Sequence, residues 1–409
     1  MLKVKRCLFV IAAAACWTCS GPAAHADWAT CQAKPTRACL FEEALRGDSG
    51  PLTGKDRLDV LVQGGALSHP EIVTTADAAE AQRLAQATPN VAGLYYAYLA
   101  IHGLVAAGQK QQAIDLIGSF ATPGQTLSIN TIQTLSVNEL VGGLVKAGDV
   151  DTALAIPDRW QPPLDPKALP SVRNNVVTAT IKALADAGKT DQALMLIADQ
   201  KHLTEAQIAD LQTAVGQAFA KRGDSKLAQN AYDQAEKNLE AARRYAAASG
   251  VQLRFASIRL LALRGQVDAV NAALQQMQSS SDAAANDPRT SYDRSQGYQR
   301  VIIALLEAKQ PEAALAAAKS ITPDTSKDAA LVGVANWYAA NGRPADARTV
   351  QALLTNTPDS PARVAVTRNL AVASAKQGDA AAALRLADEV KNPLNRRGTL
   401  FAIALALPQ

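Results

Sequence analysis

The sequence has few aromatic residues and almost no excess of charge of either sign. Phe, Trp and Tyr make up 4% of the 409 residues, whereas hydrophobic residues make up 48%. The 41 Lys and Arg residues face 37 Asp and Glu residues, a balance that does not favour nucleic acid or an anionic membrane as the main partner. Many small apolar residues and few rings favour helices that pack closely together.

Beyond the first 26 residues, the sequence lacks any apolar run that is long enough to span a membrane. Those first residues begin with three basic side chains: Lys3, Lys5 and Arg6. A short apolar run, Leu8 to Trp17, and the small-residue sequence Ala24-His25-Ala26 follow. This pattern predicts a secretory signal peptide over residues 1–26, cleaved after Ala26. Its removal leaves 38 basic and 37 acidic residues, because three basic residues leave with it.

The signal peptide predicts a periplasmic protein. Secretion from the cell is one alternative. Anchoring as an outer-membrane lipoprotein is another, because Ala13-Ala14-Ala15-Cys16 resembles part of a lipobox.

Cysteine is nearly missing from the mature chain, where only Cys31 and Cys39 remain. An even pair in an exported protein favours a disulfide. A continuous helix would hold the two residues about 12 Å apart, too far for a bond. Pro35 interrupts any such helix, so we expect a bridged turn. The alternative of a redox site lacks the usual C-x-x-C spacing.

Motifs that carry chemistry are also missing. The sequence has no H-E-x-x-H or paired-Cys metal spacing and no G-x-S-x-G nucleophile elbow. Residues 50–56 resemble a phosphate loop, but the spacing is one residue short and Asp56 stands in place of Ser or Thr. We therefore expect a non-catalytic protein with no metal and no cofactor. The alternative is an enzyme acting on envelope polymers with a dispersed site that includes Glu42, Glu43 and His69. His102 is expected to be a core or groove residue.

A repeated helical hairpin runs through most of the chain. Its turns are predicted at Gly108, Gly148, Gly188, Gly223, Gly265, Lys309, Gly342 and Gly378. Five residues after each turn stand Ala113, Ala153, Ala193, Ala228, Val270, Ala314, Ala347 and Ala383. Four residues before it stand Leu104, Leu144, Leu184, Phe219, Leu261, Leu305, Tyr338 and Ser374. Glycine suits the left-handed end of a helix, and the small residue lets the second helix approach the first. Intervals of 33 to 44 residues indicate an α-solenoid.

The clearest unit, residues 214–236, resembles a tetratricopeptide (TPR) repeat. The matching positions are Val215, Gly216, Phe219, Gly223, Ala228, Tyr232 and Ala235. The resemblance implies an all-α fold: a right-handed α-solenoid of about eight helix-turn-helix repeats with a disulfide-bonded N-terminal cap. The predicted divisions are a signal peptide (1–26), a helical cap (27–90), the repeats (91–392) and a C-terminal capping helix (393–409).

The resemblance also implies a binding surface on the concave face, lined by the first helix of each unit. Its groove positions correspond to Asn175, Thr178, Lys182, Gln217, Lys221, Phe255, Arg259, Asn336, Arg368 and Lys376. Amides and basic groups of this kind suit a peptide backbone and carboxylates. We therefore expect a scaffold that binds a protein or peptide partner. The alternative is a structural protein that self-associates through the apolar helix at 399–407, which is otherwise expected to dock on the preceding unit.

Overall fold

The computed structural model describes residues 28–48, 50–69, 72–88, 91–120, 131–160, 167, 169–245, 250–279, 288–321, 325–354, 357 and 360–408. The predicted signal peptide and its cleavage site after Ala26 lie outside these residues. Within them the fold is all-α, as predicted, with 22 α-helices, one 3-10 helix and one short β-hairpin. No described helix has both the length and the apolar character needed to cross a bilayer.

The N-terminal segment contains short elements: α1 (Trp28–Ala33), α2 (Arg37–Ala44), β1 (Arg46–Gly47), β2 (Gly50–Pro51), α3 (Gly54–Gln63), the 3-10 helix η1 (Ala66–Ser68) and α4 (Thr75–Ala87). The first helices of the hairpins are α5 (Val91–Ala106), α7 (Thr131–Lys146), α10 (Leu169–Asp186), α12 (Glu205–Lys221), α14 (Gly250–Leu263), α16 (Pro288–Glu307), α18 (Thr325–Ala340) and α20 (Pro361–Lys376). The second helices are α6 (Lys110–Gly118), α8 (Val150–Leu154) with α9 (Ile156–Arg159), α11 (Thr190–Ala198), α13 (Ser225–Tyr245), α15 (Val267–Ser279), α17 (Pro311–Ser320), α19 (Pro344–Gln351) and α21 (Ala380–Glu389). The chain closes with α22 (Pro393–Ala406).

All eight predicted turns are present and share one backbone geometry. The seven glycines and Lys309 all have positive φ, between 57° and 84°. At each turn the next residue donates its backbone N–H to the carbonyl oxygen five positions back, as Gln109 does to Leu104 at 2.8 Å. This is the Schellman arrangement, and it satisfies a carbonyl that would otherwise have no partner at the helix end.

The small residue after each turn is buried between the two helices of its hairpin, as predicted. Ala113, Ala153 and Ala193 are fully buried, and Ala228 is 3% exposed. Gly216 shows the same need for close approach, because a Cβ built there would lie 2.4 Å from the ring of Tyr232. The two helices of each hairpin therefore lie closer together than larger side chains would permit.

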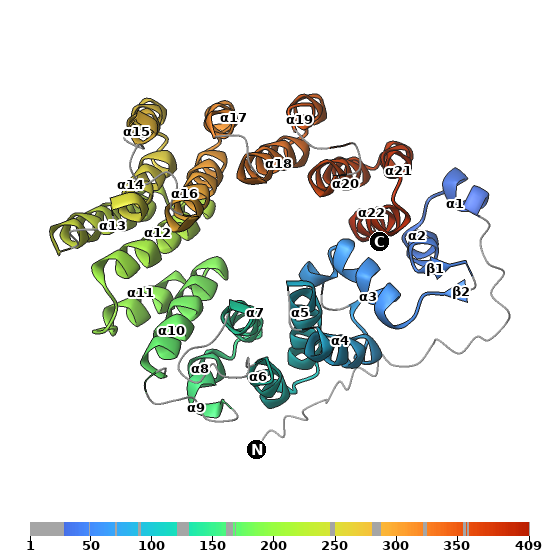
Figure 1. Ribbon diagram of the computed structural model, residues 1–409, viewed down its shortest axis with the longest axis horizontal. Coiled ribbons are helices and arrows are strands. Elements are labelled where there is room, and N and C mark those ends of the chain that lie inside the picture. Colours follow the sequence, from blue (N-terminus) through green and yellow to red (C-terminus); the bar gives the residue numbers. More distant parts are fainter. Residues whose placement is uncertain are drawn as a thin grey trace, which may run out of the picture.

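The hairpins are arranged in a closed ring (Figure 1). The first helices form its inner layer, and each contacts the next in the order α5, α7, α10, α12, α14, α16, α18 and α20. Helix α20 contacts α22, α22 contacts α3, and α3 contacts α5, which completes the circle. The second helices form an outer layer.

The ring closes because the two ends of the chain pack on each other. Helix α22 contacts α20 and α21, as expected for docking on the preceding unit, but it also contacts α2 and α3. We call this contact of α22 with α2 and α3 the seam. Phe401 is 2% exposed there, and its ring lies 4.8 Å from that of Phe41. Most apolar residues of α22 are thus covered within the chain. The contact with α20 and α21 agrees with the predicted docking, whereas the contact with α2 and α3 is not predicted from the sequence.

A disulfide joins α1 to α2 near the seam. Cys31 and Cys39 are bonded, with their Cα atoms 5.9 Å apart. The chain turns between the two helices at Lys34, Pro35 and Thr36. Thr36 caps α2 by accepting a hydrogen bond from the backbone N–H of Cys39 at 3.2 Å. This bridged turn between two short helices agrees with the sequence prediction.

Candidate partner-binding surface

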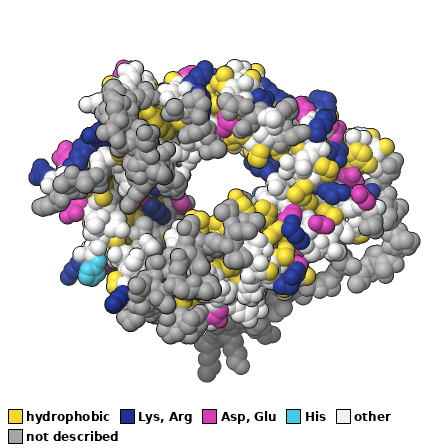
Figure 2. Space-filling model, viewed as in Figure 1, with side chains coloured by type: hydrophobic (Ala, Val, Ile, Leu, Met, Phe, Trp, Pro, Cys, Tyr) yellow, Lys and Arg dark blue, Asp and Glu magenta, His cyan; other side chains and the backbone are white. Residues whose placement is uncertain are grey.

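The inner helices surround an open passage through the middle of the ring (Figure 2). The groove residues predicted from the sequence stand two, six, ten or thirteen positions before a turn. Because three to four residues make one helical turn, these spacings place them along one face of each first helix. The structure divides them into residues that pair with one another, residues that are buried, and residues that line cavities.

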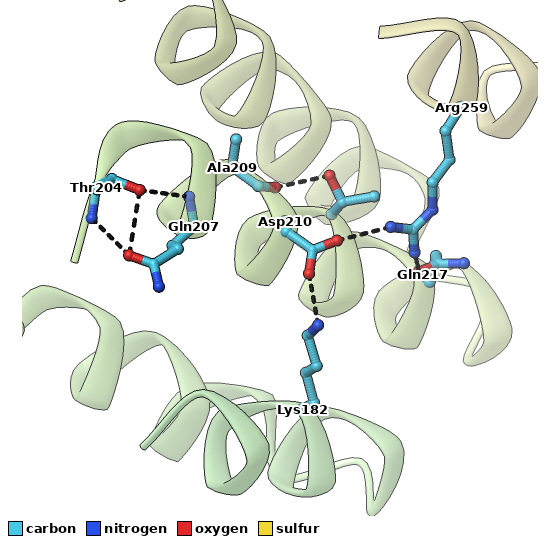
Figure 3. A network of polar contacts seen from close by, with 8 residues as sticks. Lys182, Thr204, Gln207, Ala209, Asp210, Gln217 and Arg259 are labelled. Atoms are coloured by element: carbon cyan, nitrogen blue, oxygen red, sulfur yellow. Dashed lines mark hydrogen bonds and ion pairs between the residues drawn. The ribbon is translucent and has the colours of Figure 1, made fainter. Parts of the chain in front are cut away.

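Lys182, Asp210 and Arg259 form an ion-pair network across three successive inner helices (Figure 3). The Nζ of Lys182 on α10 lies 2.5 Å from Oδ2 of Asp210 on α12. The Nη1 of Arg259 on α14 lies 2.8 Å from Oδ1 of the same carboxylate. Burial opposes ionisation of Asp210, but the nearby charges of Lys182 and Arg259 outweigh it and lower the pKa of this carboxyl.

Gln217 and Lys221 extend this network to α16. The side-chain carbonyl oxygen of Gln217 accepts a hydrogen bond from Arg259 Nη2 at 2.7 Å, and its amide nitrogen donates to Glu307. The Nζ of Lys221 lies 3.5 Å from Oε1 of Glu307. Four of the predicted groove residues therefore already have partners within the chain, and these contacts brace α10, α12, α14 and α16.

Phe255 is less accessible than a binding role needs, whereas Asn336 is half-buried. Phe255 is 3% exposed and packs edge-to-face on Tyr298, with ring centroids 5.2 Å apart. A Cβ on Gly297 would lie 2.2 Å from the Phe255 ring, so the glycine makes room for it. The Oδ1 atom of Asn336 on α18 is buried without a hydrogen-bond partner. Phe255 thus offers little of its ring to a partner on the inner face.

Arg368 and Lys376 lie at the seam, away from the other groove residues. Arg368 donates a hydrogen bond from Nη1 to the backbone oxygen of Gln63 at 2.5 Å. Burial lowers the pKa of Arg368. Both residues line a pocket that is shared between the two ends of the chain.

A larger cleft of about 600 Å³ lies between α7 and α10. Its lining residues are Thr134, Asn138, Gly142 and Lys146 of α7 with Asn175, Thr178, Ala179, Lys182, Ala183, Asp186 and Ala187 at α10. Small residues form much of the lining of this cleft, so the polar side chains at its edges are not covered by bulky neighbours. We call this cavity the α7–α10 cleft.

Several polar groups of the α7–α10 cleft have no partner among the described residues. The Oγ1 of Thr178 is buried without a hydrogen bond. Asn138, Lys146 and Asn175 form no hydrogen bond or ion pair with any described residue. Two amides and an ammonium group are therefore open to a polar ligand, and the buried hydroxyl of Thr178 also belongs to the cleft lining.

Four inner-face residues that the turn spacing identifies are absent from the predicted groove. Asn138 and Lys146 stand ten and two residues before the turn at Gly148. Asp210 stands thirteen residues before Gly223, and Glu307 stands two before Lys309. The same offsets, applied to every turn and to acidic residues, find all four.

Contacts within the chain hold the histidines and glutamates singled out in the sequence: His102, Glu42, Glu43 and His69. His102 on α5 pairs through Nε2 with Glu139 on α7. Glu42 and Glu43 both face Arg46, at 2.9 Å and 3.6 Å. His69 lines the seam pocket. In the described part of the chain, no three His, Cys, Asp or Glu side chains are grouped closely enough to hold a metal ion.

Comparison with models of known protein families and with curated proteins finds no match to this sequence. Function is therefore inferred from the inner face of the ring and from the cavities that open there.

Proposed function

We propose that this chain is an exported, non-catalytic scaffold that binds a protein or peptide partner on the inner face of the ring. In this proposal its hairpins are TPR-like repeats that form a right-handed α-solenoid with a disulfide-bonded cap. The α7–α10 cleft is the principal contact site. Export rests on the signal-peptide pattern of residues 1–26.

The proposal rests on one observation. Several polar side chains that line the α7–α10 cleft have no partner among the described residues, whereas ion pairs connect the neighbouring inner helices. Lys182 and Arg259 share the carboxylate of Asp210, and His102 pairs with Glu139. Exposed Asn138 and half-buried Asn175 have no such partner among the described residues, so a ligand can pair with them without breaking a contact within the chain.

The chemistry of the cleft suits an extended peptide segment. Each asparagine amide both donates and accepts, as a peptide group does, so the two can pair in plane. Lys146 and Asp186 offer one charge of each sign at the edge of the cleft. The cavity of about 600 Å³ has the size of a typical ligand site. Its floor of alanine and glycine permits close approach of a backbone.

The proposal is tested by placing a photo-crosslinking amino acid at Asn138 in the α7–α10 cleft. The matched control carries it at Lys237, an exposed residue of the outer helix α13. A partner captured in the source cells only from position 138 is then purified and titrated against the wild type. We expect Lys146→Glu and Asn175→Ala to weaken its binding by about tenfold or more each, and Lys237→Glu to leave it unchanged.

Reversing the charges of Lys182, Arg259 and Arg368 would be a poor test, because each of these residues makes a contact that supports the ring. Lys146 and Asn175 have no hydrogen-bond or ion-pair partner among the described residues, so we expect Lys146→Glu and Asn175→Ala to leave the fold intact. If the purified partner binds these two variants as tightly as the wild type, the cleft is not the contact site. Equal capture from positions 138 and 237 would contradict binding on the inner face.

A further inference from the structure

A second cavity, of about 410 Å³, lies at the seam and has walls from both ends of the chain. Helix α20 contributes Arg368, Asn369 and Lys376. The N-terminal segment contributes His69 and the residues around Gly64, and α22 contributes Leu405. This seam pocket is separate from the α7–α10 cleft, and its residues come from positions about three hundred residues apart in sequence.

The seam pocket is basic and has no acidic residue in its lining. Arg368 is the central group, because its guanidinium is largely buried and makes no ion pair with a described carboxylate. A guanidinium has five N–H groups. Among the described residues Arg368 makes one hydrogen bond, to the backbone oxygen of Gln63. A buried cation without a counter-ion is costly, so an anion in this pocket would be strongly favoured.

Neighbouring groups complete a site for an organic anion. Lys376 lies two helical turns beyond Arg368 on the same face of α20, and neither Lys376 nor Asn369 makes a hydrogen bond within the described chain. Val372 lies between the two cations on that face, and Leu405 of α22 also lines the pocket. The pocket therefore combines open N–H donors with an apolar wall.

We propose that the seam pocket binds the carboxylate of a small organic acid. Arg368 and Lys376 hold the negative charge, Asn369 donates a further hydrogen bond, and Val372 and Leu405 contact the hydrocarbon part. Because the walls come from both ends of the chain, the bound acid joins those ends and stabilises the closed ring. This proposal does not depend on peptide binding in the α7–α10 cleft.

The test is isothermal titration calorimetry with three probes at matched ionic strength: sodium hexanoate, sodium acetate and hexanamide. We expect saturable binding of hexanoate, weaker binding of acetate because it lacks the apolar chain, and no binding of the uncharged hexanamide. Hexanoate should also raise the melting temperature of the wild type. Absence of saturable hexanoate binding in the millimolar range, or equal binding of hexanamide, would overturn the proposal.

Three variants then assign the site. Arg368→Gln should abolish hexanoate binding, and Lys376→Gln should weaken it by about tenfold, as expected when a charge-assisted hydrogen bond is removed. Lys237→Gln on the outer helix α13 should bind like the wild type. Lys376 is exposed and has no hydrogen bond or ion pair within the described part of the chain, so we expect Lys376→Gln to fold even if Arg368→Gln does not. Unchanged hexanoate affinity in Lys376→Gln shows that the acid binds elsewhere.

Discussion

The guanidinium of Arg368 donates a hydrogen bond to the backbone oxygen of Gln63, 305 positions away in the sequence. This contact lies at the seam, where the two ends of the chain pack on each other and complete the circle of inner helices. Everywhere else in the circle, neighbouring hairpins are also consecutive in the sequence. The ring can therefore open at the seam without unfolding any hairpin, and substitutions there test closure separately from the fold of the repeats.

Gly398→Ala should weaken the seam. A Cβ at this position would lie 2.5 Å from the Cβ of Gln63 and 3.2 Å from its backbone carbon, so α3 and α22 must move apart. Overpacking of this kind destabilises by about 1 to 3 kcal/mol. We expect a lower free energy of unfolding and a larger radius of gyration by X-ray scattering, with helical circular dichroism retained.

Gly333→Ala is the matched control for the seam substitution. Gly333 also lies within a helix, α18, but a Cβ there has no neighbour within 4 Å. Alanine is the better helix former by roughly 0.5 to 1 kcal/mol, so this variant should be slightly more stable than the wild type. Equal scattering profiles for Gly398→Ala and Gly333→Ala would mean that the seam does not hold the ring closed.

Lys309→Gly should stabilise the protein. Lys309 is the one non-glycine among the eight turn residues, and its φ of 57° is a conformation that costs a side-chain-bearing residue about 1 kcal/mol. Part of the gain is offset, because glycine makes the unfolded chain more flexible. We expect a net increase of about 0.5 kcal/mol in urea unfolding. Lys237→Gly, within the regular helix α13, should instead lose about 1 kcal/mol. A loss at both positions would contradict the turn assignment.

The hairpins were predictable because their signals are local. A left-handed residue at Gly108 and a small residue at Ala113 are required by one turn and one helix pair, so sequence spacing is enough to find them. The ring was not predictable, because Phe401 and Phe41 meet only if every intervening hairpin adds the right rotation. The total rotation depends on small differences in packing between successive hairpins, and no short sequence pattern predicts these differences.

The candidate site was predictable only in part, for a related reason. The offsets from each turn correctly indicate positions on one helix face, but they do not show which side chains meet across neighbouring helices. The predicted groove includes Lys182 and Arg259 but no acidic residue, so it omits Asp210, the carboxylate that pairs with both. Asn175 and Gly142 line the same open cleft, a pairing of helices α10 and α7 that spacing along one helix does not reveal.

Asp210→Asn should reduce both the stability and its dependence on pH. The carboxylate holds two cations, and its side chain is 31% exposed, so we expect a loss of about 1 to 2 kcal/mol at neutral pH. The pKa of Asp210 is lowered below its ordinary value of 3.8. A lowered carboxyl pKa contributes stability above 3.8 that is lost as the pH falls through the lowered value.

The free energy of unfolding of the wild type should therefore fall more steeply below pH 4 than that of Asp210→Asn. Asp199→Asn serves as the control, because Asp199 is exposed and forms no ion pair within the described chain. Parallel pH profiles for the wild type and Asp210→Asn would show that ionisation of Asp210 adds no pH-dependent stability.

Thr178→Val should raise the stability of the protein but weaken partner binding. The Oγ1 of Thr178 is buried at the α7–α10 cleft without a hydrogen bond, and valine has nearly the same shape without the hydroxyl. Removing an unsatisfied buried hydroxyl should raise the free energy of unfolding by about 1 kcal/mol. If this hydroxyl is kept for a ligand, the same variant should bind the partner more weakly.

Thr180→Val, two residues along α10, provides the contrast. Thr180 is fully buried, and its hydroxyl donates to the backbone oxygen of Val176 at 2.8 Å. Valine there removes a hydrogen bond that is made, so we expect a loss of up to about 1 kcal/mol and unchanged partner binding, because Thr180 does not line the cleft. The opposite signs of the two stability changes are the informative result. A loss of stability in Thr178→Val similar to that in Thr180→Val would mean that the Thr178 hydroxyl has a structural partner, and it would remove one of the groups on which the peptide site rests.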